Sequence, residues 1–220
     1  IPEQRSQRLG HTRRCLEVLL EFRNPAVVIT KSHLVTRDAD LLSALARFDA
    51  VLVCVSVTTL RPDLHRILEP RAAPPERRLA AIRALTEAGV PVNVLVAPVI
   101  PALTDEEMPA IVDAAATAGA RSAGCVVLRL PHAVAPLVEQ RLEQHCPDRR
   151  EKILSRLRSM HGGKLYDSEF HCRLRGRGPF ADQIEDLFDL ACRRAGLDGE
   201  QPELAAAHFR RPIPEQLALL

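Results

Sequence analysis

Polar side chains lie at the ends of several apolar segments, and their types suit a small charged ligand. An amine or guanidinium binds carboxylates and phosphates, and hydroxyl and peptide groups form directional hydrogen bonds. The candidate ligand-binding residues are Lys31, Ser32, Ser56, Thr58, Arg71, Ala97 and Arg129. The competing interpretation is that Lys31 is a solvated loop cation and that Ser56 bonds only to neighbouring backbone.

Arg71 lies in a proline-rich segment, Glu69-Pro70-Arg71, which leads to Pro74-Pro75. The prolines restrict the backbone to an extended path directly before an expected helix. A helix N-terminus beside a guanidinium suits an anionic group. Pairing of Arg71 with a carboxylate, which would pin the loop, explains the same residues equally well.

Alternating apolar patterns show which elements must position these residues. Helical periodicity is expected over 9–22, 35–48, 75–88 and 104–118, and strands over 27–30, 51–57, 92–99 and 125–130. This order predicts right-handed βαβ units and a parallel sheet covered by helices. A Rossmann fold and a (β/α) barrel both fit, but the absence of G-x-G-x-x-G disfavours the former. After Pro131 only helices are expected, over 134–160 and 180–195.

Composition excludes several classes of protein. The chain has 220 residues, 46% hydrophobic and 26% charged, and a net charge of +2. No apolar run is long enough to span a membrane. The small net charge gives no strong overall positive potential of the kind found in proteins that wrap polyanions. The six cysteines and eight histidines are dispersed, so we expect no metal site, free thiols and a cytoplasmic location. The chain starts without Met, which indicates a piece of a longer protein.

Six sequence blocks together resemble the radical S-adenosylmethionine (SAM) superfamily. Within it they resemble the DNA-repair-photolyase-like group related to spore photoproduct lyase. The resemblance runs from about residue 3 to about residue 195, and the blocks are Ile29-Thr30-Lys31-Ser32, Ser56-Val57-Thr58-Thr59-Leu60, Glu69-Pro70-Arg71-Ala72-Ala73-Pro74, Arg78-Leu79-Ala80-Ala81-Ile82, Ala88-Gly89-Val90-Pro91-Val92 and Val96-Ala97-Pro98-Val99-Ile100-Pro101.

The resemblance implies a partial (β/α) TIM-like barrel whose first two βα units are missing. Residues 1–131 would form the partial barrel, and 132–220 a helical C-terminal extension packed on it. By resemblance Lys31 reaches the SAM carboxylate, Ser56 bonds polar groups of SAM, and Ala97 lies at the adenine edge. The C-x-x-x-C-x-x-C motif that holds a [4Fe-4S] cluster is absent, so the cluster ligands would lie outside this chain.

The implied function is the C-terminal portion of a radical SAM iron-sulfur enzyme with lyase-like chemistry, inactive as this segment alone. A nucleic-acid substrate and a reductant such as a flavodoxin or ferredoxin are the expected partners. One alternative is a cluster-less SAM-binding or interaction module. Another is an unrelated barrel that binds a phosphorylated ligand at Arg71 and Arg129.

Two structural expectations follow. The four strand ends should converge on a single concave rim. A barrel sheet that lacks its first strands should also leave one open edge.

Overall fold

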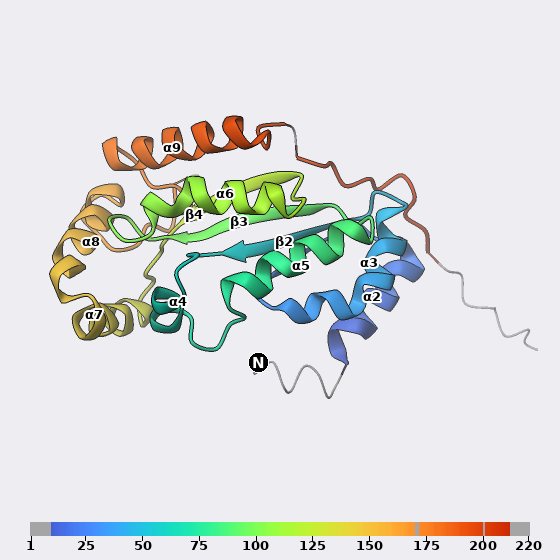
Figure 1. Ribbon diagram of the computed structural model, residues 1–220, viewed down its shortest axis with the longest axis horizontal. Coiled ribbons are helices and arrows are strands. Elements are labelled where there is room, and N and C mark those ends of the chain that lie inside the picture. Colours follow the sequence, from blue (N-terminus) through green and yellow to red (C-terminus); the bar gives the residue numbers. More distant parts are fainter. Residues whose placement is uncertain (1–9, 170–171, 200, 212–220) are drawn as a thin grey trace, which may run out of the picture.

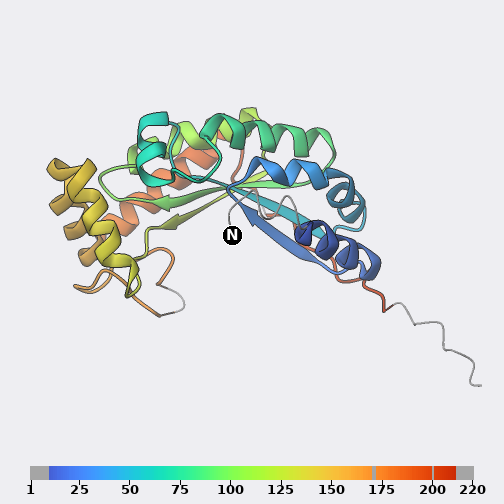
Figure 2. The ribbon, with the colours of Figure 1, turned by 90° about the horizontal axis from the view of Figure 1, so that it is seen from below.

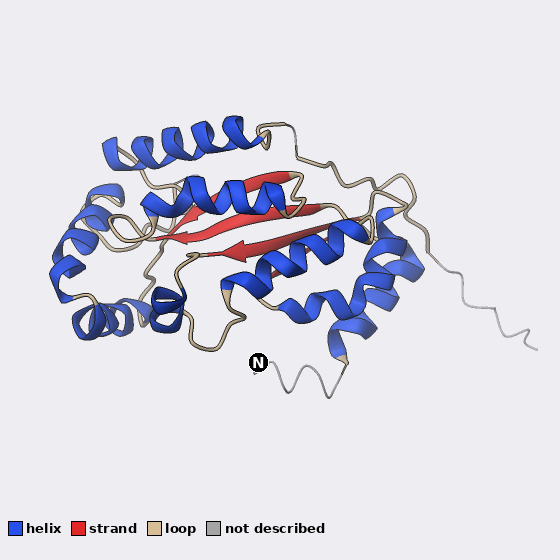
Figure 3. Cartoon of the chain, viewed as in Figure 1, coloured by secondary structure: helices blue, strands red, loops and turns tan. Residues whose placement is uncertain are grey.

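A computed structural model describes residues 10–169, 172–199 and 201–211. Its four strands form a parallel sheet in the order β1-β2-β3-β4 (Figures 1 and 3). The strands are β1 (Ala26–Thr30), β2 (Val51–Val57), β3 (Val92–Val99) and β4 (Ser122–Val127). The helices are α2 (His11–Phe22), η1 (His33–Asp38), α3 (Ala39–Ala46), α4 (Pro62–Leu68), α5 (Pro75–Glu87), η2 (Asp105–Glu107), α6 (Met108–Thr117), α7 (Val134–His145), α8 (Pro147–Met160) and α9 (Pro179–Ala195).

The core lies between this sheet and the helices that follow its strands. All seven residues of β2 are buried, as its unbroken apolar and β-branched sequence predicts. Helices α3 and α5 pack on β2, and α6 packs on β3 (Figure 1). This parallel α/β alternation confirms the predicted fold class and is consistent with a partial TIM-like barrel followed by helices.

Strand β1 forms an edge of the sheet in the described part of the chain. It pairs with β2, and Val27 and Ile29 are 51% and 65% exposed. Figure 2, which views the sheet along its plane, shows β1 at the margin with α2 beside it. Among the described residues β1 pairs with β2 alone, which agrees with the expected open edge.

The fourth strand begins earlier than its apolar run predicts. The expected range was 125–130, but β4 covers Ser122–Val127. Ser122 is buried and donates a 2.9 Å hydrogen bond to Asn93 Oδ1, which draws this polar residue into the sheet. Arg129 therefore follows the strand instead of lying on it.

Two helical segments also differ from expectation. Helix α4 was not predicted, because its seven residues are too few for a clear periodic signal. The helix expected over 104–118 is the turn η2 followed by α6. The Thr104 hydroxyl accepts a hydrogen bond from the Ile100 amide at 2.8 Å, so it does not cap the helix.

The helices after residue 131 group beside the carboxyl ends of the strands and against α6. The segment expected over 134–160 is two helices, α7 and α8, which meet at Cys146, and α9 agrees with its expected range. Helix α9 packs on α6 and α8 (Figure 1). Residues 201–211 wrap back to the opposite end, where the Arg210 amide donates to the Phe22 carbonyl at 2.9 Å. Among the described residues, no helix combines the length and apolar character needed to cross a bilayer.

Candidate functional site

A pocket of about 200 Å³ lies at the carboxyl ends of the strands, and each strand end contributes one residue to it. Lys31 follows β1, Thr58 follows β2, Pro98 is on β3 and Leu128 follows β4. We call it the strand-end pocket, and its other lining residues are Ile67, Leu68, Glu69, Ile100, Val138, Arg141 and Leu142. The four strand ends therefore converge as the sequence predicts, although only the first two contribute polar side chains.

Lys31 is ion-paired inside the pocket. Its ammonium group binds Glu69 Oε1 and lies 3.5 Å from Thr58 Oγ1. The Lys31 side chain is 36% exposed, whereas that of Glu69 is 12% exposed. Lys31 is therefore a partly accessible cation with its counterion already in place.

Thr58 joins the ends of β2 and β3. Its buried hydroxyl donates a 2.8 Å hydrogen bond to the Ala97 carbonyl. Thr58 therefore helps to position Lys31 and binds the carbonyl of Ala97, the residue that by resemblance lies at the adenine edge.

Arg78 anchors the carboxylate of the pocket from beneath. It lies on α5, is 1% exposed, and donates to the carbonyls of Ala73 and Ser56 at 2.7 and 2.9 Å. Its Nη2 also donates to Glu69 Oε2 at 2.6 Å. The two Glu69 oxygens thus bind two different cations, which fixes the orientation of the carboxylate.

Electrostatics keep Glu69 ionised. Burial alone would raise the pKa of this carboxyl, but the opposing charges of Lys31 and Arg78 and their hydrogen bonds outweigh it, so the pKa lies below its ordinary value. The pocket therefore presents a stable carboxylate beside an ammonium group.

Arg141 adds a second accessible cation from outside the sheet. It lies on α7, and its Nε donates a 2.9 Å hydrogen bond to the Ile67 carbonyl at the end of α4. One of the five guanidinium N–H donors is used in this way. With Lys31, Glu69 and Arg141, the strand-end pocket has two positive charges and one negative charge.

The sequence reasoning missed the roles of Arg78 and Arg141. Arg78 precedes Ile82 by one helical turn, so it lies on the apolar stripe of an expected helix, and this pattern was a usable signal. Arg141 carries no such signal, because its position depends on a contact between α7 and the end of α4. Arg141 and Ile67, which form that contact, are 74 residues apart in the sequence.

The remaining candidate residues lie outside the strand-end pocket. The Ser32 hydroxyl accepts a 3.1 Å hydrogen bond from the Leu34 amide and so caps the start of η1. Ser32 lines a different pocket, which lies beside β1. Ser56 is buried in β2, where its carbonyl binds Arg78. Arg71 is exposed on the loop before α5, and Arg129 is half-buried beyond β4. Arg78, rather than Arg71, pairs with the carboxylate that pins this loop.

The described residues do not fit an iron-sulfur cluster. Within 10–169, 172–199 and 201–211, no three His, Cys, Asp or Glu side chains are grouped to hold a metal ion. Burial raises the pKa of the Cys125 and Cys192 thiols to about 11, so both are protonated at neutral pH. A thiolate ligand set is therefore not present in this part of the protein.

Several uncharacterized proteins are similar to a part of this chain. An uncharacterized protein of Acidianus two-tailed virus is 42% identical over 90 residues, which cover 41% of this chain and 29% of the viral protein. An uncharacterized protein of Mycobacterium tuberculosis (strain H37Rv) is 40% identical over 98 residues, 44% of this chain and 29% of that protein. One from Methanocaldococcus jannaschii is 32% identical over 80 residues, 36% of this chain and 30% of that protein.

The aligned segments span less than a third of the length of these relatives, whose names assign no activity. Residues 9–115 match the family model of the Radical SAM superfamily. This segment includes Lys31, Thr58, Glu69 and Pro98 of the strand-end pocket. Residues 9–115 are therefore similar to the radical SAM superfamily.

Proposed function

We propose that the strand-end pocket binds SAM as part of a larger radical SAM protein. The observation that carries the proposal is the meeting of all four strand ends at a pocket that contains Lys31 beside Glu69. The methionyl part of SAM is a zwitterion, whose carboxylate suits Lys31 or Arg141 and whose ammonium group suits Glu69. A site with both signs of charge is complementary to such a ligand.

The size of the pocket indicates how much of the ligand these residues hold. At about 200 Å³ it is smaller than the roughly 300–1,000 Å³ of most small-molecule sites. Ile67, Leu68, Ile100 and Leu142 supply apolar wall next to the charged groups. We infer that the pocket holds the methionyl end of SAM and that the rest of the nucleoside extends beyond it.

The cluster chemistry of the superfamily is not assigned to these residues. The described residues offer no ligand set, and the chain lacks C-x-x-x-C-x-x-C. Their part in the proposed function is to bind and orient SAM: Lys31 and Arg141 toward its carboxylate, and Glu69 toward its ammonium group.

A calorimetric titration of the chain with SAM tests the proposal. Lys31→Ala should weaken SAM binding by about tenfold or more, because a hydrogen bond to a charged group contributes roughly 1.5–3 kcal/mol. Lys164→Ala is the matched control, since Lys164 is exposed and lies outside every pocket described above. Methionine should compete for the site better than adenosine. Equal SAM affinity in wild-type and Lys31→Ala protein contradicts the proposal.

A second candidate is a SAM-binding module without a cluster, since the described residues by themselves offer SAM-binding groups but no group of metal ligands. Iron and sulfide analysis of the anaerobically reconstituted full-length protein separates the two. About four irons per protein support the radical enzyme, and SAM binding without iron supports the module.

The finer assignment, to the group related to spore photoproduct lyase, rests on the sequence blocks described above. Under this proposal the complete protein acts on a nucleic acid and receives electrons from a flavodoxin or ferredoxin. Anaerobic turnover of ultraviolet-damaged DNA by the full-length protein, measured as loss of the lesion, tests it. Consumption of SAM only with other substrates would exclude this group.

A further inference from the structure

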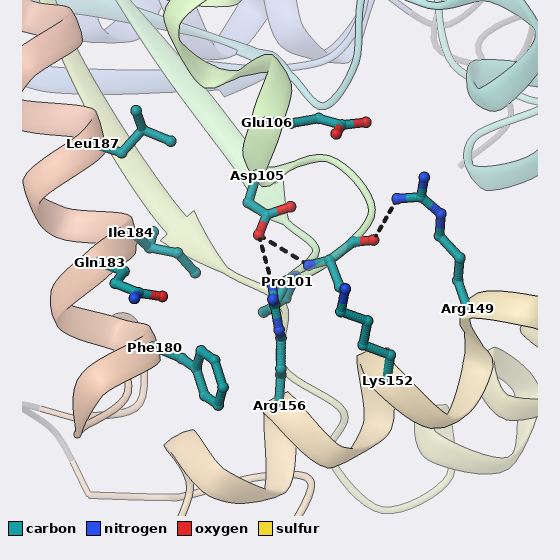
Figure 4. Close-up of a pocket in the computed structure, with 11 residues that line it drawn as sticks. Pro101, Asp105, Glu106, Arg149, Lys152, Arg156, Phe180, Gln183, Ile184 and Leu187 are labelled. Carbon is teal, nitrogen blue, oxygen red and sulfur yellow. Dashed lines mark hydrogen bonds and ion pairs between the residues drawn. The ribbon is translucent and has the colours of Figure 1, made fainter.

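A second pocket, of about 370 Å³, lies between α8, α9 and the segment that follows β3. We call it the extension pocket. Figure 4 shows Arg149, Lys152 and Arg156 on α8 and Phe180, Ile184 and Leu187 on α9 around it. Its volume falls within the range of small-molecule sites. The proposed SAM site makes no use of these residues.

One wall of the extension pocket is cationic. Arg149, Lys152 and Arg156 are spaced three and four residues apart, so they share one face of α8. Arg149 Nη1 donates to the Ala102 carbonyl at 2.9 Å, and Arg156 Nη1 lies 3.2 Å from Asp105 Oδ2. These contacts hold both guanidinium groups in place while each uses a single donor. Lys152 extends toward the same loop (Figure 4) and has no ion pair within the described residues.

The nearby acidic groups do not neutralise this wall. Asp105 Oδ2 is shared between Arg156 and the amide of Ala102, 3.0 Å away. Glu106 also lines the pocket, and Arg61 lies 3.9 Å from its carboxylate. Neither Arg149 nor Lys152 forms an ion pair with a described residue, so the α8 face keeps an excess of positive charge. An anionic ligand group would supply a counterion.

The opposite wall is apolar. Phe180, Ile184 and Leu187 are spaced four and three residues apart on α9, and their side chains face the α8 cations (Figure 4). The Arg156 guanidinium carbon lies 4.9 Å from the Phe180 ring centroid, a distance at which the cation and the ring attract. A ligand that fits both walls has an anionic group on one side and an apolar or aromatic body on the other.

We propose that the extension pocket binds an organic phosphate, with the phosphate on Arg149, Lys152 and Arg156 and the organic part on α9. Phosphate oxygens accept several charge-assisted hydrogen bonds at once, which suits two guanidinium groups and an amine better than a single carboxylate does. Ile100 lines the strand-end pocket and Pro101 lines the extension pocket, so the two sites adjoin the same loop after β3. The proposal does not depend on SAM binding.

Calorimetric titration of the 220-residue chain with AMP, with adenosine and with a 5′-phosphorylated single-stranded decathymidylate tests this inference. AMP should bind, and adenosine, which lacks the phosphate, should bind at least about tenfold more weakly. Comparable affinity for AMP and the oligonucleotide identifies a free organic phosphate as the ligand. Binding of the oligonucleotide alone identifies a nucleic-acid phosphate. Absence of binding by both phosphate-bearing probes overturns the proposal.

Variants on α8 separate a specific site from general electrostatic attraction. Lys152→Ala should weaken binding of the phosphate-bearing probe by roughly tenfold, in line with the loss of one charged hydrogen bond, and Lys152→Arg should restore most of it. Arg158→Ala is the matched control, because Arg158 is exposed on the same helix and does not line the pocket. Equal weakening by Lys152→Ala and Arg158→Ala contradicts the inference. Unfolding curves that coincide with wild type confirm that both variants are folded.

Discussion

Replacement of Arg78 by Met should destabilise the fold strongly, because it removes the buried cation beneath the strand-end pocket. The guanidinium is 1% exposed and donates to two backbone carbonyls and to Glu69. Removal of one partner of a buried ion pair costs about 3–5 kcal/mol. For a chain of this length, that loss corresponds to a fall of roughly 6–20 °C in Tm.

Urea unfolding followed by circular dichroism measures this effect. Arg77→Met is the matched control: Arg77 is the preceding residue on α5, is exposed, and should change the free energy of unfolding by at most about 0.5 kcal/mol. Arg78→Lys keeps the charge but cannot reproduce all three hydrogen bonds, so its loss should lie between those of the other two variants.

A double-mutant cycle identifies the interaction itself. Glu69→Gln combined with Arg78→Met should cost less than the sum of the two single losses, by about 0.5–3 kcal/mol, because the two side chains are in direct contact. A loss below about 1 kcal/mol for Arg78→Met, or strict additivity in the cycle, would refute the argument that this pair holds the loop.

Three further predictions concern pH and backbone geometry. The pKa of Glu69 is lowered in the folded chain, so Glu69 contributes fully to stability above its ordinary pKa of 4.5. This contribution is lost as the pH falls through the lower folded pKa, and Glu69→Gln should flatten the acid side of the curve of unfolding free energy against pH. Burial lowers the pKa of His161 from 6.5, so on acidification the unfolded chain binds the proton before the folded chain does. The free energy of unfolding should therefore fall as the pH drops below 6.5. His161→Phe should remove this pH dependence in urea titrations. Gly176→Ala should destabilise more than Gly163→Ala in thermal melts, because both residues have positive φ but only a Cβ at Gly176 would lie 2.9 Å from Met160 Cβ; equal losses would show that backbone strain alone acts.

Much of the fold could be predicted from local patterns. The uniformly apolar run Val51–Val57 is typical of a strand covered on both faces, and β2 is such a strand. The pattern over 75–88 likewise indicates a helix, which α5 confirms. These predictions succeed because the hydrophobic pattern, continuous in β2 and periodic in α5, shows which faces of each element are buried.

Irregular elements were harder to predict. Strand β4 starts at Ser122, whose polar side chain is satisfied by Asn93 on the neighbouring strand. Helix α4 is only seven residues long. For β4 the decisive contact comes from Asn93, which is distant in sequence, and for α4 the segment is too short to show a clear period.

The sequence alone determined that polar residues stand at the ends of parallel strands, because the order of strands and helices sets the end of the sheet at which each loop emerges. Only the tertiary structure decided which of them meet. Lys31 faces Glu69, Arg78 is buried beneath it, and Arg141 arrives from α7. These pairings depend on how the helices pack against one another, and no periodic pattern in the chain encodes that packing.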